Sequence, residues 1–215
     1  MTDKYHLTRE QNLFAAKRGV VDCIYNSARL EGCNVTFPDT YTILEGVNVG
    51  SVTLDDIQTI LNLRDAWRFI MSTAGEPFNL DYLCKINEHI SRNESLAWGT
   101  LRTGRVGISG TEYAPPLPTR ESAQALLDSL GGTATDQAIA FFLKACRAQL
   151  FWDGNKRTAT LGANKILIQA GAGYFTIKTK HINEFNNRLL DYCNTDDMSV
   201  VDAWLYDNCI EGIEL

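Results

Sequence analysis

Apolar residues recur at helical spacing along most of this 215-residue chain. The clearest case lies in residues 53–72, where the apolar positions are Ile57, Ile60, Leu61, Leu63, Trp67 and Ile70. Repeated intervals of three and four residues place side chains on one face of a helix. Thr53 or Asp55 can accept hydrogen bonds from the first free amides of this segment and so cap it. The pattern predicts a protein built from helices that each bury one face.

Several other segments share this pattern. Helices are expected over residues 11–30, 41–44, 80–90, 120–130, 136–149, 155–169, 181–192 and 199–208. Asn79 is a suitable cap for one of them, whereas residues 37–39 (Phe-Pro-Asp) are expected to open a loop. We expect an all-α fold that forms one globular unit, with residues 1–50 as an N-terminal helical region packed on a core of residues 51–215.

One stretch breaks the helical pattern. Residues 98–118 contain Gly99, Gly104, Gly107 and Gly110, followed by Pro115, Pro116 and Pro118. Val106, Ile108 and Tyr113 alternate with the glycines in a way that suits a short β-hairpin. The expected architecture is therefore a helical bundle with one small hairpin.

Composition excludes several classes of function. The formal net charge of −6 and the lack of a Lys/Arg run argue against nucleic-acid binding, which needs a basic patch. Residues 1–18 lack the layout of a signal peptide, and no apolar run is long enough for a membrane span. The six cysteines form no CxxC pair, and the three histidines lie far apart, so reduced thiols are expected and a His-rich metal site is not. These features are typical of a cytoplasmic protein.

A polar turn at residues 149–157 (Gln-Leu-Phe-Trp-Asp-Gly-Asn-Lys-Arg) separates two expected helices. Gly154 lets a ligand approach the backbone, and the amides that begin the next helix point outward with the positive end of its dipole. Lys156 and Arg157 add positive charge, and the planar fork of Arg157 suits phosphate oxygens. Asp153 offers a carboxylate to Mg²⁺. Because Arg157 follows an exposed loop, its replacement is expected to leave the fold intact.

The same residues also have a purely structural interpretation, in which Asp-Gly makes a turn and Asn155 caps a helix with exposed basic residues. A resemblance favours the functional interpretation. The segment is similar to the active-site motif of the Fic family, H-P-F-x-D/E-G-N-G/K-R-x-x-R. The matching positions are Phe151, Asp153, Gly154, Asn155, Lys156 and Arg157.

Two further segments resemble Fic elements. Arg102 and residues 106–116 (Val-Gly-Ile-Ser-Gly-Thr-Glu-Tyr-Ala-Pro-Pro) are similar to the family's flap hairpin, which holds a target segment beside the nucleotide. The flap residues expected to contact a target are Val106, Gly107, Ile108, Ser109 and Gly110. Ser27 and Glu31 lie in a segment, Ser-Ala-Arg-Leu-Glu-Gly, that resembles the (S/T)xxxE(G/N) inhibitory motif. Its position ahead of the core resembles class II of the family, and the likeness extends over residues 20–173.

The resemblance implies transfer of AMP from ATP to a Ser, Thr or Tyr hydroxyl of a target protein. Asp153 would hold Mg²⁺, and Gly154, Asn155, Lys156 and Arg157 would surround the nucleotide phosphates. Glu31 would enter the site and disturb the position of the γ-phosphate. Because Fic proteins often dimerise, a homodimer is a further expectation.

Three positions depart from the motif. Gln149 replaces the histidine that acts as general base, and an amide cannot accept a proton near neutral pH. Thr160 replaces the second arginine, which contacts the γ-phosphate and pairs with the inhibitory glutamate. Leu150 replaces the proline, a milder change. The departures leave three functions open: an adenylyltransferase with weak or altered activity, an inactive interaction module that uses the same cleft, and a Fic protein with different phosphate-transfer chemistry.

Three other residues invite functional interpretations that their neighbours oppose. His89 lies among Leu and Ile residues and is expected to be a core or half-buried histidine rather than a displaced base. Cys146 lies one turn before Gln149, but Phe142, Leu143 and Ala145 around it predict a buried thiol. Trp152 can stack on a nucleobase, and packing beside Phe151 is the alternative.

Overall fold

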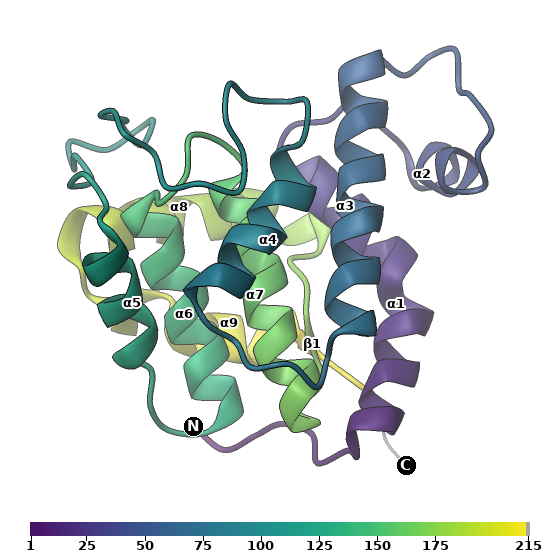
Figure 1. The fold of residues 1–215 in the computed structure, drawn as a ribbon. Helices are drawn as coiled ribbons and strands as arrows, with labels where there is room; N and C mark the ends of the chain where they lie inside the picture. Colours follow the sequence, from purple (N-terminus) through teal and green to yellow (C-terminus); the bar gives the residue numbers. More distant parts are fainter. Residues whose placement is uncertain (214–215) are drawn as a thin grey trace.

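The structure is a computed structural model that describes residues 1–213, apart from the side chain of Val200. Its helices are α1 (Arg9–Leu30), α2 (Phe37–Leu44), α3 (Leu54–Ser72), α4 (Leu80–Ser91), α5 (Arg120–Asp128), α6 (Ala134–Ala148), α7 (Asn155–Ala170), α8 (Ile182–Thr195) and α9 (Asp202–Cys209), with 3-10 turns at Thr179–His181 and Met198–Val200. β1 (Tyr174–Phe175) and β2 (Ile210–Glu211) pair antiparallel, with Tyr174 opposite Glu211. This mostly helical architecture confirms the predicted fold class (Figure 1).

Short polar side chains set most helix starts. Thr53 caps α3 and Asn79 caps α4, as predicted. The loop predicted at residues 37–39 is wrong, because these residues form the first turn of α2. Thr36 and Asp39 make a reciprocal capping box there, and a proline in the first turn removes no intrahelical hydrogen bond. The other helices begin and end within three residues of their predicted bounds.

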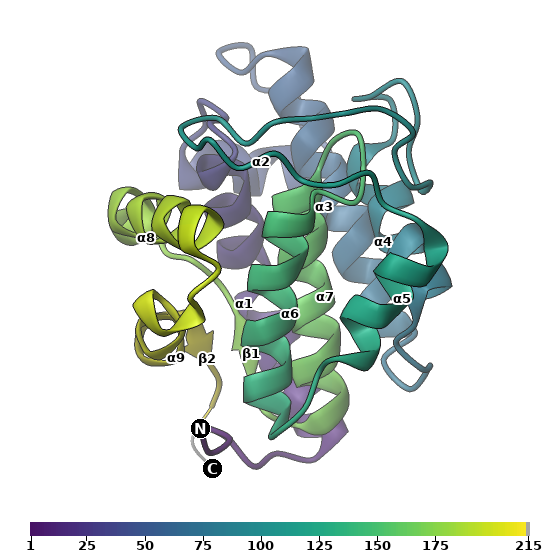
Figure 2. The same ribbon diagram turned by 90° about the vertical axis from the view of Figure 1, so that its left-hand side faces the viewer.

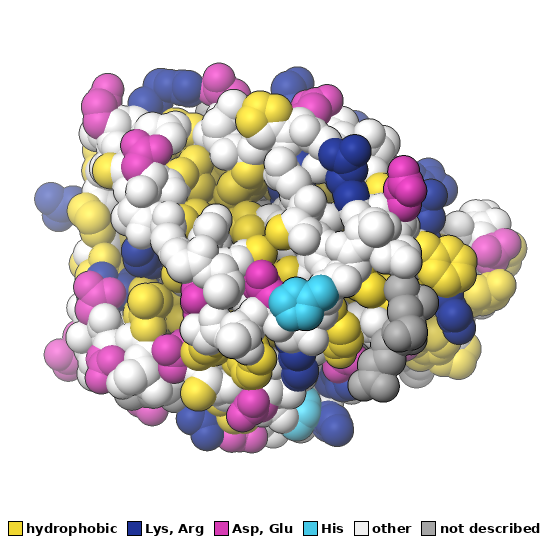
Figure 3. Space-filling model, turned by 90° about the horizontal axis from the view of Figure 1, so that it is seen from below, with side chains coloured by type: hydrophobic (Ala, Val, Ile, Leu, Met, Phe, Trp, Pro, Cys, Tyr) yellow, Lys and Arg dark blue, Asp and Glu magenta, His cyan; other side chains and the backbone are white. Residues whose placement is uncertain are grey.

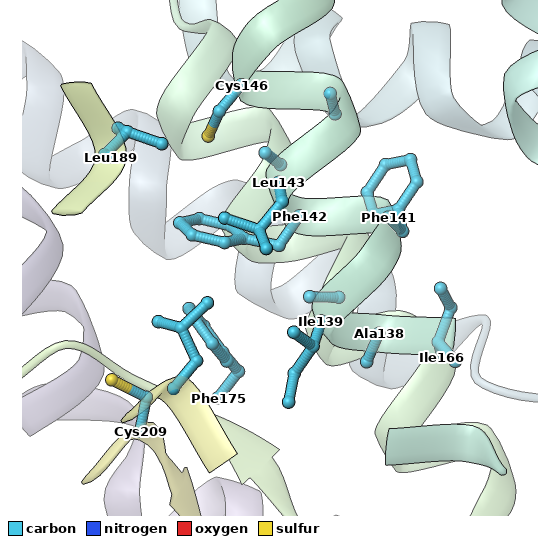
Figure 4. Packing of buried hydrophobic residues seen from close by; sticks show 14 of the residues in the cluster. Ala138, Ile139, Phe141, Phe142, Leu143, Cys146, Ile166, Phe175, Leu189 and Cys209 are labelled. Atoms are coloured by element: carbon cyan, nitrogen blue, oxygen red, sulfur yellow. The ribbon is translucent and has the colours of Figure 1, made fainter. Parts of the chain in front are cut away.

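The core is organised around α7, which is buried continuously from Arg157 to Ile168. α6 packs along it so closely that an added Cβ at Gly162 would clash with the ring of Phe141. Figure 4 shows apolar side chains of α6, among them Phe142, converging with residues from the small sheet and α8. A second apolar cluster fills the space between α7 and helices α1 to α4. The division of the chain into an N-terminal region of residues 1–50 and a core of residues 51–215 stays a prediction.

Residues 98–118, which we call the flap segment, all lie within the described chain and form no strand. The predicted hairpin at this position is therefore wrong. The small antiparallel sheet is formed by β1 and β2 instead. The carbonyls of Gly104, Pro115 and Pro116 accept hydrogen bonds from the guanidinium of Arg102, at 2.6, 3.2 and 2.6 Å, rather than from a facing strand. The prolines also remove amides that a β-ladder would need.

The chain direction brings several helix ends together. α1, α4 and α6 end, and α7 begins, at the same end of the bundle (Figure 1), and Figure 2 shows the flap segment running across this end. The opposite face carries acidic and basic side chains interspersed with apolar ones (Figure 3). None of the helices in residues 1–213 is long and apolar enough to cross a lipid bilayer. The predicted site residues lie at the end beneath the flap segment.

Candidate functional site

The loop between α6 and α7 is closed on itself by the side chain of Asn155. Its Oδ1 accepts a hydrogen bond from the amide of Phe151 (2.9 Å), and its Nδ2 donates to the carbonyl of the same residue (2.8 Å). Gln149 ends α6 and Gly154 precedes α7, and both have positive φ angles, 46° and 68°. A left-handed residue at each end lets the chain reverse over a short distance.

The C-terminal part of α4 holds this loop in place. Asn87 Nδ2 donates to the carbonyl of Asp153 (3.0 Å) and to Thr158 Oγ1 (3.1 Å), and Ser91 Oγ donates to the same carbonyl (3.1 Å). Gly154 lies so close to α4 that an added Cβ would clash with Ser91 Oγ. Because its φ angle is also positive, glycine is required here for two independent reasons.

Arg157, in the first turn of α7, is only 4% exposed. Its Nη1 donates to Glu94 Oε2 at 2.6 Å and to the carbonyl of Ile90 at 3.3 Å. Its Nε lies 3.7 Å from Glu31 Oε2, and its Nη2 lies 3.8 Å from Asp153 Oδ2. These two separations are ion-pair distances that exceed a hydrogen bond. One end of the guanidinium is therefore hydrogen-bonded, while its Nε–Nη2 edge makes only the two longer ion-pair contacts.

Two buried polar atoms, one of Arg157 and one of Glu31, lie at or beside this edge. Nε of Arg157 and Oε1 of Glu31 are buried, and neither has a hydrogen-bond partner among the described residues. Burial opposes the charged form of Arg157, but the carboxylates of Glu31 and Glu94 outweigh it and hold the pKa of Arg157 above its ordinary value. Because buried polar groups are nearly always hydrogen-bonded, the unsatisfied pair marks a place for a polar ligand or water.

Lys156 completes a cluster of charges around this edge. Its Nζ lies 3.5 Å from Glu31 Oε1 and 3.4 Å from the last carbonyl of α1, where the helix dipole favours a cation. The carboxylates of Glu31, Glu94 and Asp153 face the two cations Lys156 and Arg157, so one negative charge is uncompensated. An incoming phosphate must therefore bring a cation or displace a carboxylate.

The N-terminus of α7 and the carboxylate of Asp153 fit a magnesium–phosphate group. Within the described chain no side chain caps α7, so its first amides are free to donate. Asp153 Oδ1 accepts from the amide of Gly154 (2.6 Å), and the side chain is 47% exposed. Residues 1–213 contain no cluster of three acidic, His or Cys ligands. The half-exposed carboxylate of Asp153 suits Mg²⁺, which is usually held by one or two carboxylates together with substrate phosphates.

Gln149 is turned back onto its own helix. Its Nε2 donates to the carbonyl of Cys146 (2.7 Å), which caps the end of α6. The backbone carbonyl of Gln149 accepts a hydrogen bond from Arg102 Nε (2.6 Å). The backbone carbonyl of Leu150 accepts one from the backbone amide of Arg102 (3.0 Å). Arg102 is 1% exposed, and its donors join the end of α6 to the flap segment.

We expect Arg102→Ala to release the flap segment and to lower the free energy of unfolding by about 3 kcal/mol, because buried carbonyls lose charged donors and water replaces them only in part. Amide hydrogen exchange of residues 98–118 measures the first effect, and chemical denaturation measures the second. Arg105→Ala is the matched control, since Arg105 is an exposed arginine of the same segment. Equal exchange in the two variants would contradict the role given to Arg102.

The predicted target contacts lie in the middle of the flap segment. Residues 106–110 are exposed or half-buried, and Ile108 and Thr111 close a turn through a backbone hydrogen bond of 3.1 Å. Gly110 adopts a positive φ of 86° against the side chain of Leu190 on α8. The structure thus fixes the position of these residues, and their contact with a target stays a prediction.

The other predicted residues lie as follows. Ser27 is buried one turn before Glu31, on α1. Thr160 is buried, and its hydroxyl bonds the carbonyl of Lys156 at 3.0 Å, so this position brings no charge to the site. Trp152 is 38% exposed and packs against the flap at Gly104, where an added Cβ would clash with the indole.

His89 and Cys146 both belong to packed surroundings. The ring of His89 lies 5.0 Å from that of Phe69 on α3, and burial is the main cause that lowers the pKa of His89. Cys146 is 3% exposed, which confirms the predicted buried thiol, and burial raises its pKa. All six cysteines are unpaired. Neither residue approaches Arg157 in the way that Glu31 does.

Glu94 is a site residue that the sequence did not reveal. It follows α4, and Asn62 Nδ2 of α3 donates to its Oε1 at 2.7 Å. Asn87, which anchors the loop, was missed as well. No local signal marks either residue, because their roles depend on the approach of α4 to α7.

The fold and the site define a class of protein: a helical bundle with an uncapped helix N-terminus beside a buried arginine and three carboxylates. Residues 77–167 match the profile of the Fic/DOC family. Over these residues the chain is similar to Fic domains. A search of curated proteins finds no match.

Solved structures of Fic proteins share this fold. Fic-1 from C. elegans superposes with a TM-score of 0.78 and 18% identity, covering 90% of this chain and 62% of that one. A Fic domain-containing signaling protein from Bacteroides thetaiotaomicron superposes with a TM-score of 0.74 and 20% identity. The match covers 94% of this chain and 86% of that one. A Fic family protein from Desulfovibrio desulfuricans superposes with a TM-score of 0.64 and 19% identity. The match covers 92% of this chain and 59% of that one. The chain thus spans about three fifths of the Fic-1 structure, and at these identities the likeness concerns the fold.

Proposed function

We propose that this chain binds ATP with Mg²⁺ at residues 153–157 and is a protein adenylyltransferase whose activity is weak or altered because Gln149 stands in the place of the general base. Fic domains generally transfer a nucleoside monophosphate to proteins. The hydroxyl acceptor would be a Ser, Thr or Tyr of a target protein held along residues 106–110.

The observation that carries the proposal is the Nε–Nη2 edge of Arg157, which has ion-pair contacts but no hydrogen bond among the described residues. Two parallel N–H groups at such an edge match two oxygens of a phosphate, a geometry that Lys cannot offer. The free amides of α7 lie beside it and add the positive end of a helix dipole. Buried in low dielectric and held by Glu94, this edge needs little reorganisation to bind an anion.

The acidic side chains have separate proposed roles. Asp153 is half-exposed and would hold Mg²⁺, which when bound neutralises phosphate charge and orients the phosphate chain. Glu31 lies at the phosphate-binding edge of Arg157 without a hydrogen bond to it, and a phosphate oxygen would take its place. In this proposal Glu31 competes with the nucleotide and inhibits its binding. The backbone carbonyl of Ser27 accepts a hydrogen bond from the amide of Glu31 at 3.2 Å.

We expect Glu31→Gly to tighten ATP/Mg²⁺ binding, because it removes a carboxylate from the edge that the phosphate must reach. A gain of about 1–2 kcal/mol, roughly 5- to 30-fold in Kd, fits the removal of one competing charge in a partly exposed site. Titration calorimetry measures the change. Glu45→Gly is the control, since Glu45 ends the neighbouring helix α2 and is exposed. Equal ATP affinity of Glu31→Gly and wild type would remove Glu31 from the site.

A second function is favoured by the position of Gln149. Its amide is committed to the carbonyl of Cys146 and can neither take a proton nor reach forward without giving up that bond. An inactive module that binds a nucleotide or a peptide in the same cleft is therefore the alternative. Incubation with ATP labelled at the α- or the γ-phosphate separates the candidates. α-Label on protein supports AMP transfer, γ-label supports a different phosphate transfer, and ATP binding without label supports the inactive module.

A further inference from the structure

The strongest unexplained feature outside the predicted site is the contact between Glu94 and Arg157. At 2.6 Å it is the shortest of the ion pairs that Arg157 makes, and both side chains are largely buried, at 5% and 13% exposure. Two opposite consequences are conceivable. Glu94 either neutralises Arg157 and withdraws it from a phosphate, or it fixes the guanidinium so that another edge faces the phosphate.

The atoms involved favour the second consequence. Glu94 contacts Nη1, and the carbonyl of Ile90 accepts from the same nitrogen at 3.3 Å. Nε and Nη2, which together form the edge suited to a phosphate, face Glu31 and Asp153 instead. Glu94 therefore contacts only Nη1 and does not occupy the Nε–Nη2 edge.

Glu94 is itself held from the far side. Asn62 Nδ2 donates to its Oε1 at 2.7 Å and also to the carbonyls of Ile90 (3.2 Å) and Arg92 (2.8 Å). Gln58 Nε2 donates to Asn62 Oδ1 at 2.9 Å. This chain of hydrogen bonds runs from α3 through Glu94 to Nη1 of Arg157, so the orientation of the arginine is fixed by residues that do not reach its open edge.

From this geometry we infer that Glu94 is a positioning residue, which with Asn62 orients Arg157 for the nucleotide phosphate. The inference rests on the proposed function, since it assigns the phosphate to the Nε–Nη2 edge. It predicts an effect of unusual sign. Removal of a negative charge near an anion site should strengthen anion binding by Coulomb's law, whereas loss of a positioning residue should weaken it.

The test compares ATP/Mg²⁺ affinity in the Glu31→Gly background by calorimetry. We expect added Glu94→Ala to weaken binding by roughly 10-fold or more, as for other residues that orient a ligating group. Added Glu94→Gln, which retains one acceptor, should weaken it less, and added Asn62→Ala should weaken it although Asn62 does not contact Arg157. Glu88→Ala is the matched control: this acid lies on α4, its side chain is 45% exposed, and it pairs only with Arg92 among the described basic groups.

A second readout reports orientation without a nucleotide. With ¹⁵N-labelled arginine, the Nε–H signal of Arg157, assigned through Arg157→Lys, should be sharp in wild type and should broaden or shift in Glu94→Ala and Asn62→Ala. Thermal melts identify the temperature at which each variant is folded. Equal or tighter ATP binding by Glu94→Ala, with an unchanged Nε–H signal, would overturn the inference. If Glu31→Gly itself binds no ATP, the proposed function fails, and the Nε–H signal still decides whether Glu94 orients Arg157.

Discussion

The double variant Gln149→His/Glu31→Gly should label itself with α-labelled ATP on the order of 10²-fold faster than Glu31→Gly alone, because a positioned general base contributes about 10²–10⁴ in rate. Histidine has a pKa near neutrality and can take the proton of an incoming hydroxyl. It should also fit the backbone, since position 149 has a φ of 46° and histidine is among the residues enriched at positive φ. Autoradiography of the purified variants at equal concentration measures the gain.

Gln149→Asn in the same background is the control for this experiment. Asparagine tolerates the left-handed conformation and keeps an amide, but it cannot act as a base. Efficient labelling by wild type, with nothing added by histidine, would mean that another base operates. A double variant that binds ATP and stays unlabelled would show that the absent second arginine at Thr160, or the flap segment, also limits catalysis, and the inactive module would then be favoured.

Arg157→Ala should both destabilise the protein and weaken ATP binding. Loss of one partner of a buried ion pair leaves the other charge uncompensated, which costs about 3–5 kcal/mol. Loss of a charged hydrogen-bond donor to phosphate should cost a further 1.5–3 kcal/mol in binding. The sequence predicted an unchanged fold for this substitution. The structure corrects that expectation, because Arg157 is 4% exposed and bonded to Glu94.

A double-mutant cycle separates the two effects. Arg157→Met/Glu94→Gln replaces the ion pair by a neutral pair of similar volume, which should recover much of the lost stability. ATP affinity should remain low, because the phosphate-binding edge is gone. Urea denaturation and calorimetry on the same samples give both quantities. Recovery of ATP affinity together with stability would mean that Arg157 supports the fold and does not bind the phosphate.

The sequence predicted the helical class and the loop between α6 and α7 because both depend on residues that are adjacent in the sequence. Helical periodicity gave most helix bounds, and Asp153, Gly154 and Asn155 form a local turn whose geometry follows from their own side chains. Glu31 and Arg157 are 126 positions apart, and only the likeness to an inhibitory motif connected them before the structure placed them 3.7 Å apart.

The failures concern contacts that no local pattern encodes. The alternation of apolar residues and glycines in the flap segment suggested strands, but Arg102 satisfies its carbonyls and no ladder forms. Glu94 carries no sequence signal, since an acidic residue after a helix is ordinarily solvated. Its burial depends on Asn62, which α3 brings from a separate part of the chain.

The central claim, that a nucleotide phosphate binds at the N-terminus of α7, is tested most directly by amide chemical-shift mapping. ¹⁵N-labelled Glu31→Gly is titrated with ATP/Mg²⁺, and shifts are followed residue by residue. The largest shifts should fall on the amides of residues 154–157 and on Arg157 Nε–H, with smaller ones across the flap segment. Saturable shifts confined to another surface, such as the groove of about 480 Å³ between the flap segment, α5 and α6 that Leu117, Leu126 and Lys144 line, would contradict the claim.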